Sequence, residues 1–255
     1  SSAASDVYKR QVSKVKVPLT TSPRFQKEAA EIALQMSQFS VDELERLLRV
    51  NAKIAVENYK RYQAFHAEAT PELPALLAYT GIVFKRLNPK DFSAEDFGYA
   101  QEHLRLTSFC YGLLRPLDVI RAYRLEGDVV LPELGNQTLF SYWRSRLTDT
   151  FIEDIRSAGG ILCNLASDEM KSLFDWKRVE KEVRVITPEF QVWKNGKLAS
   201  IVIYIKMSRG EMTRFILKNR IENPEDLKSF SWEGFEFNES LSNEKKFVFT
   251  NGKEI

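Results

Sequence analysis

In the first half of the chain, apolar residues recur at spacings of three and four, which is the period of an amphipathic helix. A first helix is predicted after Ser22-Pro23, and its apolar face consists of Phe25, Ala29, Ile32, Ala33 and Met36. Ser40 and Glu43 have the spacing of a capping box, so a second helix is expected to begin there. Further helices are expected over 51–66, from Ser93 with Asp96 onward, and over 138–157, where Gly159-Gly160 ends the longest one.

The second half has the pattern of a β-rich region. A short buried strand is expected at 161–164, and strands at 183–193 and 198–205 are joined by Lys194-Asn195-Gly196 into a hairpin. Ser208 with Glu211 predicts the start of a helix that continues to Ile221, and Asn223-Pro224-Glu225 starts a short one. Edge strands are expected at 235–237 and 247–249. The pattern predicts a mixed α/β (α+β) fold in a single compact domain, with a helical first half and a mixed sheet.

Composition narrows the chemistry that this chain can support. Its 255 residues include only two histidines and two cysteines, which excludes a disulfide framework and a Cys/His zinc cluster. We therefore expect no metal and no cofactor. No stretch approaches the roughly 20 apolar residues of a membrane span, so no membrane partner is expected, and a reducing cytoplasm is the default compartment. Cys110 is expected to be a small buried residue.

Charge is distributed unevenly along the sequence. The net charge is +2, but residues 222–255 carry −4 and the first 221 residues carry +6. A basic body is compatible with an anionic partner, although ordinary solvated faces would give the same numbers.

The segment 104–118 consists of an expected helix end, a short polar turn and an apolar stretch that stops at Pro116. A helix-hairpin-helix DNA module has this plan, because its hairpin offers backbone N–H groups to a phosphate. Arg105 and Arg115 flank the turn, and Arg121 and Arg124 follow. The alternative is an ordinary packing corner between two helices, since Ser108 and Phe109 stand where such hairpins usually carry glycine.

A second candidate is the turn from Asn164 to Glu169, which follows an apolar strand. A strand-to-helix turn points free N–H groups outward, so Asn164 and Ser167 are candidates for binding an anion. Asp168 and Glu169 are candidates for acid–base chemistry. In the structural alternative, Ser167 caps the helix and the two acids stabilise its positive end.

The third candidate is the segment 206–220, where five basic residues stand against Glu211. On a helix, Arg209 and Arg220 fall on one stripe with Lys206 beside it, and this element could engage phosphates. The alternative is a solvated helix with Met212 and Phe215 facing inward.

Several motifs in order resemble the YaaA family of bacterial peroxide-stress proteins. The matching residues are Glu95-Asp96-Phe97, Gln101-Glu102-His103-Leu104-Arg105, 111–118, Tyr123-Arg124-Leu125-Glu126, 164–169, 209–212, Arg214-Phe215-Ile216, Asn219-Arg220 and 230–237. The resemblance extends from about Thr20 to the C-terminus. Members of this family open with a short apolar strand and an Ile-Ser-Pro-Ala-Lys-like motif. Residues 2–11 differ from it, so 1–19 is expected to be a foreign or mis-translated segment with its leader, and 20–255 the domain.

The resemblance implies a single-domain mixed α/β fold with a positively charged cleft and a helix-hairpin-helix-like element. It further implies DNA binding, a link to recombination and repair, and a role in limiting iron and peroxide damage in the cytoplasm. The hairpin would contain Ser108, Tyr111 and Gly112. The cleft residues implied on this chain are Arg105, Arg115, Arg121, Arg124, Lys206, Arg209, Arg214 and Arg220.

We therefore expect a protein that binds duplex or branched DNA without sequence preference and without catalysis. The alternative is an enzyme that acts on a nucleotide or nucleic acid, with Ser167, Asp168, Glu169 and Lys206 around an anion pocket. Iron storage fits poorly, because two isolated histidines do not supply a His and carboxylate cluster.

Overall fold

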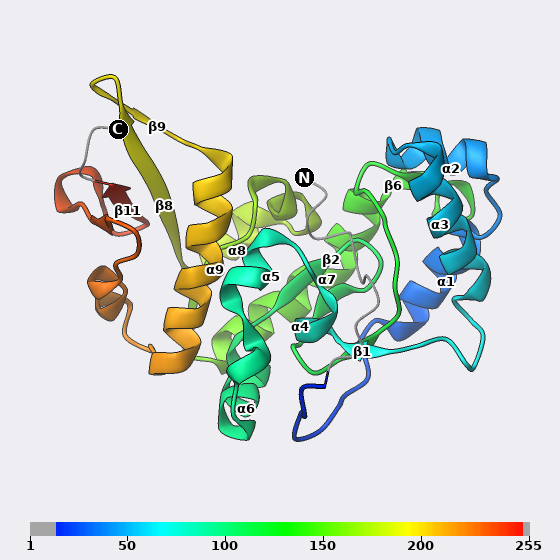
Figure 1. Cartoon of the computed structure of the whole chain (residues 1–255), viewed down its shortest axis with the longest axis horizontal. Helices are drawn as coiled ribbons and strands as arrows, with labels where there is room; N and C mark the ends of the chain where they lie inside the picture. Colours follow the sequence, from blue (N-terminus) through cyan, green and yellow to red (C-terminus); the bar gives the residue numbers. More distant parts are fainter. Residues whose placement is uncertain (1–13, 252–255) are drawn as a thin grey trace. The chain divides into compact units, whose positions relative to one another are not determined.

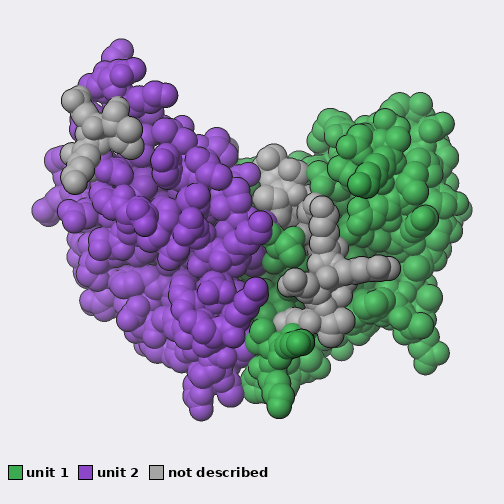
Figure 2. Space-filling view, viewed as in Figure 1, with its two compact units in different colours: residues 1–80, 101–151, 167–176 green, residues 81–100, 152–166, 177–255 purple. Residues whose placement is uncertain are grey.

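A computed structural model describes residues 14–251 of the chain (Figure 1). The chain forms two compact units, and neither is a continuous stretch of sequence (Figure 2). Unit 1 comprises 1–80, 101–151 and 167–176, and unit 2 comprises 81–100, 152–166 and 177–255. The predicted mixed α/β class is confirmed. The segment that we expected to be foreign lies mostly outside the described residues.

The helices of unit 1 begin where the local sequence predicts them. The Glu43 N–H donates to Ser40 Oγ at 3.2 Å and the Ser40 N–H donates to Glu43 Oε2 at 2.7 Å, which completes the capping box. Asn51 caps the following helix by accepting a hydrogen bond from the Ile54 N–H at 3.0 Å. The helices are α1 (Gln26–Met36), α2 (Val41–Leu48), α3 (Ala52–Ala64), α4 (Ala75–Ala78), most of α7 (Leu139–Ser157), and the 3-10 helices Pro132–Leu134 and Asp168–Leu173.

The strands of unit 1 form three short antiparallel pairs. These are β1 (Leu73–Pro74) with β4 (Val119–Ile120), β2 (Leu106–Ser108) with β3 (Gly112–Leu114), and β5 (Val130–Leu131) with β6 (Gln137–Thr138). Gly112 has a φ of +72°, and a Cβ on it would lie 2.7 Å from the Trp143 ring. Only glycine therefore lets the β2–β3 hairpin pack directly against α7. The Trp143 indole also donates to the Phe109 carbonyl at 2.8 Å.

Unit 2 is built on a mixed sheet with the strand order β10–β11–β8–β7, and β9 pairs with the free end of β8. β8 runs parallel to β7 and β11, while β9 and β10 pair antiparallel with their neighbours. The strands are β7 (Ile161–Cys163), β8 (Arg184–Lys194), β9 (Lys197–Ala199), β10 (Phe235–Phe237) and β11 (Lys246–Asn251). The helices are α5 (Ile82–Leu87), the first part of α6 (Ala94–His103), most of α8 (Trp176–Glu182), α9 (Val202–Asn219), and the 3-10 helices Pro89–Asp91, Pro224–Ser229 and Glu239–Leu241.

The core of unit 2 is aromatic. Phe190 of β8 stacks on Phe249 of β11 with ring centroids 5.5 Å apart, and Phe230 packs edge-on against both rings. α9 covers this core and also packs against α5. A Cβ on Gly210 would lie 2.3 Å from the Val83 carbonyl oxygen, so glycine is what allows α9 to approach α5 so closely.

Three predictions in this unit were wrong. The strand expected at 198–205 ends at Ala199, and α9 begins at Val202, six residues before the start expected at Ser208. Ser208 is a fully buried residue inside the helix and not its cap. β11 lies between β10 and β8, although an edge strand was expected there. Its residues from Phe247 to Thr250 are all buried, which is typical of an interior strand.

Candidate functional site

The segment expected to hold a helix-hairpin-helix-like element is a buried β-hairpin. Ser108 and Tyr111 are each 1% exposed, and Gly112 opens strand β3. The N–H groups of Cys110 and Tyr111 donate to Ser108 Oγ at 3.3 and 2.9 Å, so these amides are already used inside the protein. The segment therefore differs from the element that we expected, and its turn offers no exposed donors at these positions for a phosphate.

The arginines around this hairpin are bound within unit 1. Arg105 donates to the carbonyls of Gln101 and Leu104, both at 2.9 Å. Arg115 pairs at 2.9 Å with Asp118, whose carboxylate is fully buried. These contacts hold the chain in place, so neither arginine presents a free guanidinium to a ligand.

Arg121 joins two segments of unit 1 that are distant in sequence. Its guanidinium donates to the carbonyls of Phe65 and Ala67, the latter at 2.9 Å, and pairs with Glu72 at 3.0 Å. The side chain is 18% exposed. Its expected place in a phosphate cleft is therefore replaced by a structural role.

Arg124 belongs to a group of charged residues in unit 1. Arg49 lies 4.0 Å from Glu126 and pairs with Asp128 at 2.7 Å. Burial raises the pKa of the Glu126 carboxyl, and the positive charges of Arg124 and Arg49 oppose this shift. The negative charge of Glu169 also raises the pKa of Glu126. Glu126 ends a motif that carries the family resemblance, although it was not among the residues expected at a site.

In the turn that begins at Asn164, the first residue has a structural role, but the cap expected from Ser167 does not form. The Asn164 N–H donates to the Ile186 carbonyl at 2.8 Å and its Oδ1 accepts a hydrogen bond from the Ala166 N–H at 3.3 Å. Ser167 occupies the position before the 3-10 helix Asp168–Leu173, but its side chain makes no capping hydrogen bond. The Asp168 side chain is 90% exposed and pairs with Lys171 at 3.1 Å. Asp168 therefore lacks the buried setting that tunes a carboxylate for acid–base catalysis.

The basic residues in the last turns of α9 pair with two aspartates of unit 2. Arg214 bonds to Asp91, with one N–O distance of 2.9 Å, while Lys218 and Arg220 each reach Asp96 at 2.8 Å. Partial burial alone would raise the pKa of Asp96. Hydrogen bonds from Lys218, Ser93 and Arg220 outweigh that effect and hold this pKa well below its usual value. Arg214 and Arg220, which were expected as cleft residues, are thus engaged in ion pairs within unit 2.

We single out three lysines of unit 2, at the β8–β9 hairpin and near the start of α9, as candidates for binding an anion. Lys194 and Lys197 face each other in register at the exposed tip of the β8–β9 hairpin, and Lys206 is half-buried near the start of α9. Within residues 14–251, none of the three forms an ion pair. Like charges directly opposite on a hairpin are destabilising, so the fold itself gains nothing from the facing pair. We call Lys194, Lys197 and Lys206 the lysine set.

The sequence around the lysine set is strongly basic. Residues 177–220 contain eleven Lys and Arg and four Glu, a net charge of +7. Arg209, which we expected on the same helical stripe, lies half-buried on α9.

Comparison with known proteins decides the family. The model of the family described as peroxide stress protein YaaA matches residues 1–241. The chain belongs to this family. A UPF0246 protein of Bacteroides thetaiotaomicron is 93% identical over 241 residues, which cover 94% of each chain. A UPF0246 protein of Clostridium beijerinckii is 39% identical over 232 residues, covering 90% of this chain and 89% of that one.

The structure of this YaaA-family chain adds two observations about metals and membranes. Among residues 14–251, no three His, Cys, Asp or Glu side chains are grouped as they would be to hold a metal ion. No helix in the same residues is long and apolar enough to cross a membrane.

Proposed function

We propose that this peroxide stress protein binds DNA without sequence preference and so limits peroxide damage to it. The observation that carries the proposal is the lysine set in the +7 segment 177–220, whose three members have no carboxylate partner within residues 14–251. Phosphate binding needs such charges, because neutralising phosphates releases counterions and drives sequence-independent binding. A role in DNA repair belongs to the same proposal.

The shape of the β8–β9 hairpin supports phosphate contacts. Lys194, Asn195, Gly196 and Lys197 are all exposed, and the pair of lysines flanks the turn. A long flexible lysine acts as a point charge that meets a phosphate without a fixed geometry, which suits binding to any sequence.

Both cysteines of the chain are free thiols, and we place the activity in the reducing cytoplasm on that ground.

The test measures DNA affinity as a function of salt concentration. Fluorescence anisotropy with labelled duplex and four-way branched DNA gives the dissociation constant at several salt concentrations. For the wild type, log K should fall steeply with log salt. If Lys194 and Lys197 each neutralise one phosphate, the double variant Lys194→Gln/Lys197→Gln should bind more weakly and lose about 1.8 from that slope.

A charge-matched control separates this site from a general effect of net charge. Lys27 and Lys53 are exposed lysines of unit 1, and Lys27→Gln/Lys53→Gln removes the same two charges. We expect the control to keep nearly all of the wild-type slope. Equal slopes for the hairpin variant and the wild type would refute the assignment of this hairpin. An affinity that does not change with salt for any variant would refute DNA binding through phosphates altogether.

A further inference from the structure

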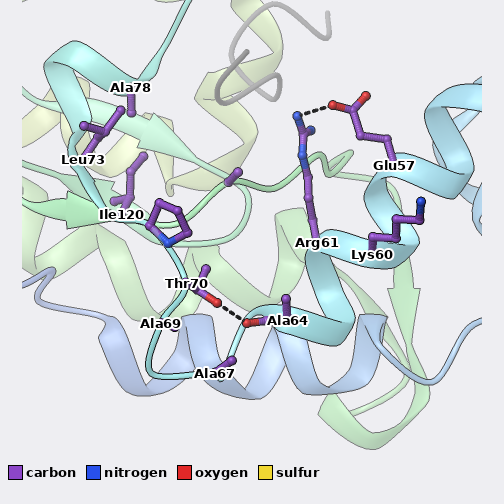
Figure 3. Close-up of a pocket in the computed structure, with 12 residues that line it drawn as sticks. Glu57, Lys60, Arg61, Ala64, Ala67, Ala69, Thr70, Leu73, Ala78 and Ile120 are labelled. Carbon is purple, nitrogen blue, oxygen red and sulfur yellow. Dashed lines mark hydrogen bonds and ion pairs between the residues drawn. The ribbon is translucent and has the colours of Figure 1, made fainter. Parts of the chain in front are cut away.

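Unit 1 contains a cavity of about 530 Å³ between α3 and the β1–β4 pair (Figure 3). This volume lies within the range of small-molecule sites, roughly 300 to 1,000 Å³. Figure 3 shows Leu73, Ala78 and Ile120 on one side and Lys60 and Arg61 of α3 on the other. The cavity is independent of the lysine set, because all of its lining residues belong to unit 1.

The wall away from α3 is hydrocarbon. Leu73, Ala78, Ile120 and Ala122 line it, and the alanines leave the space that larger side chains would fill. Thr70 brings a hydroxyl to the cavity, but this hydroxyl donates to the Ala64 carbonyl (Figure 3). A ligand body therefore meets apolar groups along this wall.

The charged side carries a fixed ion pair and one further cation. Arg61 binds Glu57 at 2.8 Å and donates to Asn58 Oδ1 at 3.1 Å, so the charges of Arg61 and Glu57 offset each other (Figure 3). Asn58 is fully buried and is itself held by a 2.9 Å bond to the Ile54 carbonyl. Lys60 is exposed beside them and forms no ion pair within the described part of the chain. The charged side thus has one uncompensated positive charge.

The connection between α3 and β1 lines the cavity and is held in place. Arg121 donates to the carbonyls of Phe65 and of Ala67, which itself lines the cavity, and pairs with Glu72, which lies between the lining residues Pro71 and Leu73. The cavity is therefore formed before a ligand arrives, which lowers the entropic cost of binding.

We infer that this cavity binds a small monoanion with a hydrocarbon body, such as a medium-chain carboxylate. Its carboxylate lies at Lys60 and its chain lies against Leu73, Ala78 and Ile120. A single lysine matches a single negative charge, whereas a phosphate monoester carries nearly two. A nucleobase would need hydrogen-bond donors and acceptors along the hydrocarbon wall, whereas the one side-chain hydroxyl there already donates its proton to the Ala64 carbonyl and can only accept.

The test is an NMR titration of the full-length protein with octanoate. Octanoate should shift amide signals of residues that line the cavity, with a dissociation constant on the order of millimolar. Octanol lacks the charge and acetate lacks the chain, so both should bind more weakly. Lys60→Glu should weaken octanoate binding about five- to tenfold. Lys53→Glu, on an exposed position of the same helix, should leave it unchanged.

A cavity-filling variant makes the site itself testable. Ala69 is an exposed lining residue, so Ala69→Trp fills the cavity without disturbing the core, and circular dichroism checks that the variant is folded. It should abolish the octanoate shifts. Octanoate binding that survives Ala69→Trp would overturn the site. Equal binding of octanol, or shifts with adenosine monophosphate but not with octanoate, would overturn the ligand class.

Discussion

A substitution of Asp96 offers the sharpest test of whether the basic side chains at the end of α9 stabilise the fold. Its carboxylate is 10% exposed and accepts hydrogen bonds from Lys218 and Arg220, each at 2.8 Å, and from the Ser93 N–H at 2.9 Å. Asp96→Asn keeps an oxygen that can cap Ser93 but removes the charge that both cations face. The expected result is a loss of stability, with no new cavity.

The size of the stability loss follows from the two hydrogen bonds whose acceptor changes from a charged to a neutral group. A hydrogen bond to a charged group contributes about 1 kcal/mol more than a neutral one, and two such bonds are affected. Asp96 also lies in the first turn of α6, where a negative charge adds roughly 0.3–1 kcal/mol. Lys218 and Arg220 are 29% and 36% exposed, so solvent screening reduces the total. We expect a loss of about 2 kcal/mol in the free energy of unfolding at pH 7.

Urea unfolding at two pH values measures this loss and its origin. An unfolded aspartate has a pKa of about 3.9, and the native pKa of Asp96 is lower. Its stabilisation is therefore complete above the unfolded pKa and is lost as the pH falls through the native one. The difference between wild type and Asp96→Asn should shrink by about 1 kcal/mol between pH 6 and pH 3.

The control is Asp226→Asn, the same change at an exposed aspartate of unit 2. It should cost less than about 0.5 kcal/mol. A loss for Asp96→Asn no greater than for this control, or a difference that is the same at pH 6 and pH 3, would refute the ion-pair account. Arg220 would then be available again as a phosphate contact.

Two further predictions concern the buried hydroxyl and thiol groups. Tyr123→Phe removes a buried hydroxyl that is hydrogen-bonded to the hydroxyls of Tyr79 and Ser108, both at 2.6 Å. The free energy of unfolding, measured with urea, should fall by about 1–3 kcal/mol. A loss under about 0.5 kcal/mol would contradict the hydrogen-bond network. Burial raises the pKa of the Cys110 thiol and raises the pKa of Cys163 to about 12. Neither thiol should therefore react with a thiol reagent at pH 8 in the native protein, and both should react in urea. A thiol that reacts in the native protein as fast as in the unfolded protein would disprove this.

Local signals in the sequence were sufficient for many element starts. The capping box at Ser40 was confirmed, and Ser93 and Asp96 bond each other's backbone N–H groups at the start of α6. These contacts join residues three apart, so the sequence contains both partners within one turn. The longest helix ends at Ser157, two residues before Gly159, as predicted.

The start of α9 could not be predicted because two local patterns compete there. The run from Ile201 to Ile205 is rich in β-branched residues and follows a hairpin turn, which favours a strand. Tyr204 and Ile205 pack on the aromatic core of unit 2, and that packing is gained in a helix that starts at Val202. Val202 itself is 64% exposed and gains little from this packing. Its preference for a strand was therefore outweighed by the packing of Tyr204 and Ile205.

The ion-pair partners of the arginines could not be predicted from the sequence either. Arg214 and Asp91 are 123 positions apart, and Arg121 and Glu72 are 49 apart. A charge count treats each of these arginines as a free cation, because it cannot include a carboxylate that only the fold brings close. For that reason the sequence assigned a basic partner surface to side chains that the fold already uses in internal contacts.

The different contacts of arginine and lysine side chains bear on the proposed DNA binding. The planar guanidinium makes several fixed hydrogen bonds at once, which suits the internal contacts of Arg115, Arg121 and Arg214. A phosphate could recruit such an arginine only by displacing its carboxylate, at the cost of leaving that carboxylate unpaired. Lys194 and Lys197 face no such competition, so a phosphate gains their full charge. DNA binding by this chain should therefore depend on its exposed lysines, while removal of its paired arginines should first be seen as a loss of stability.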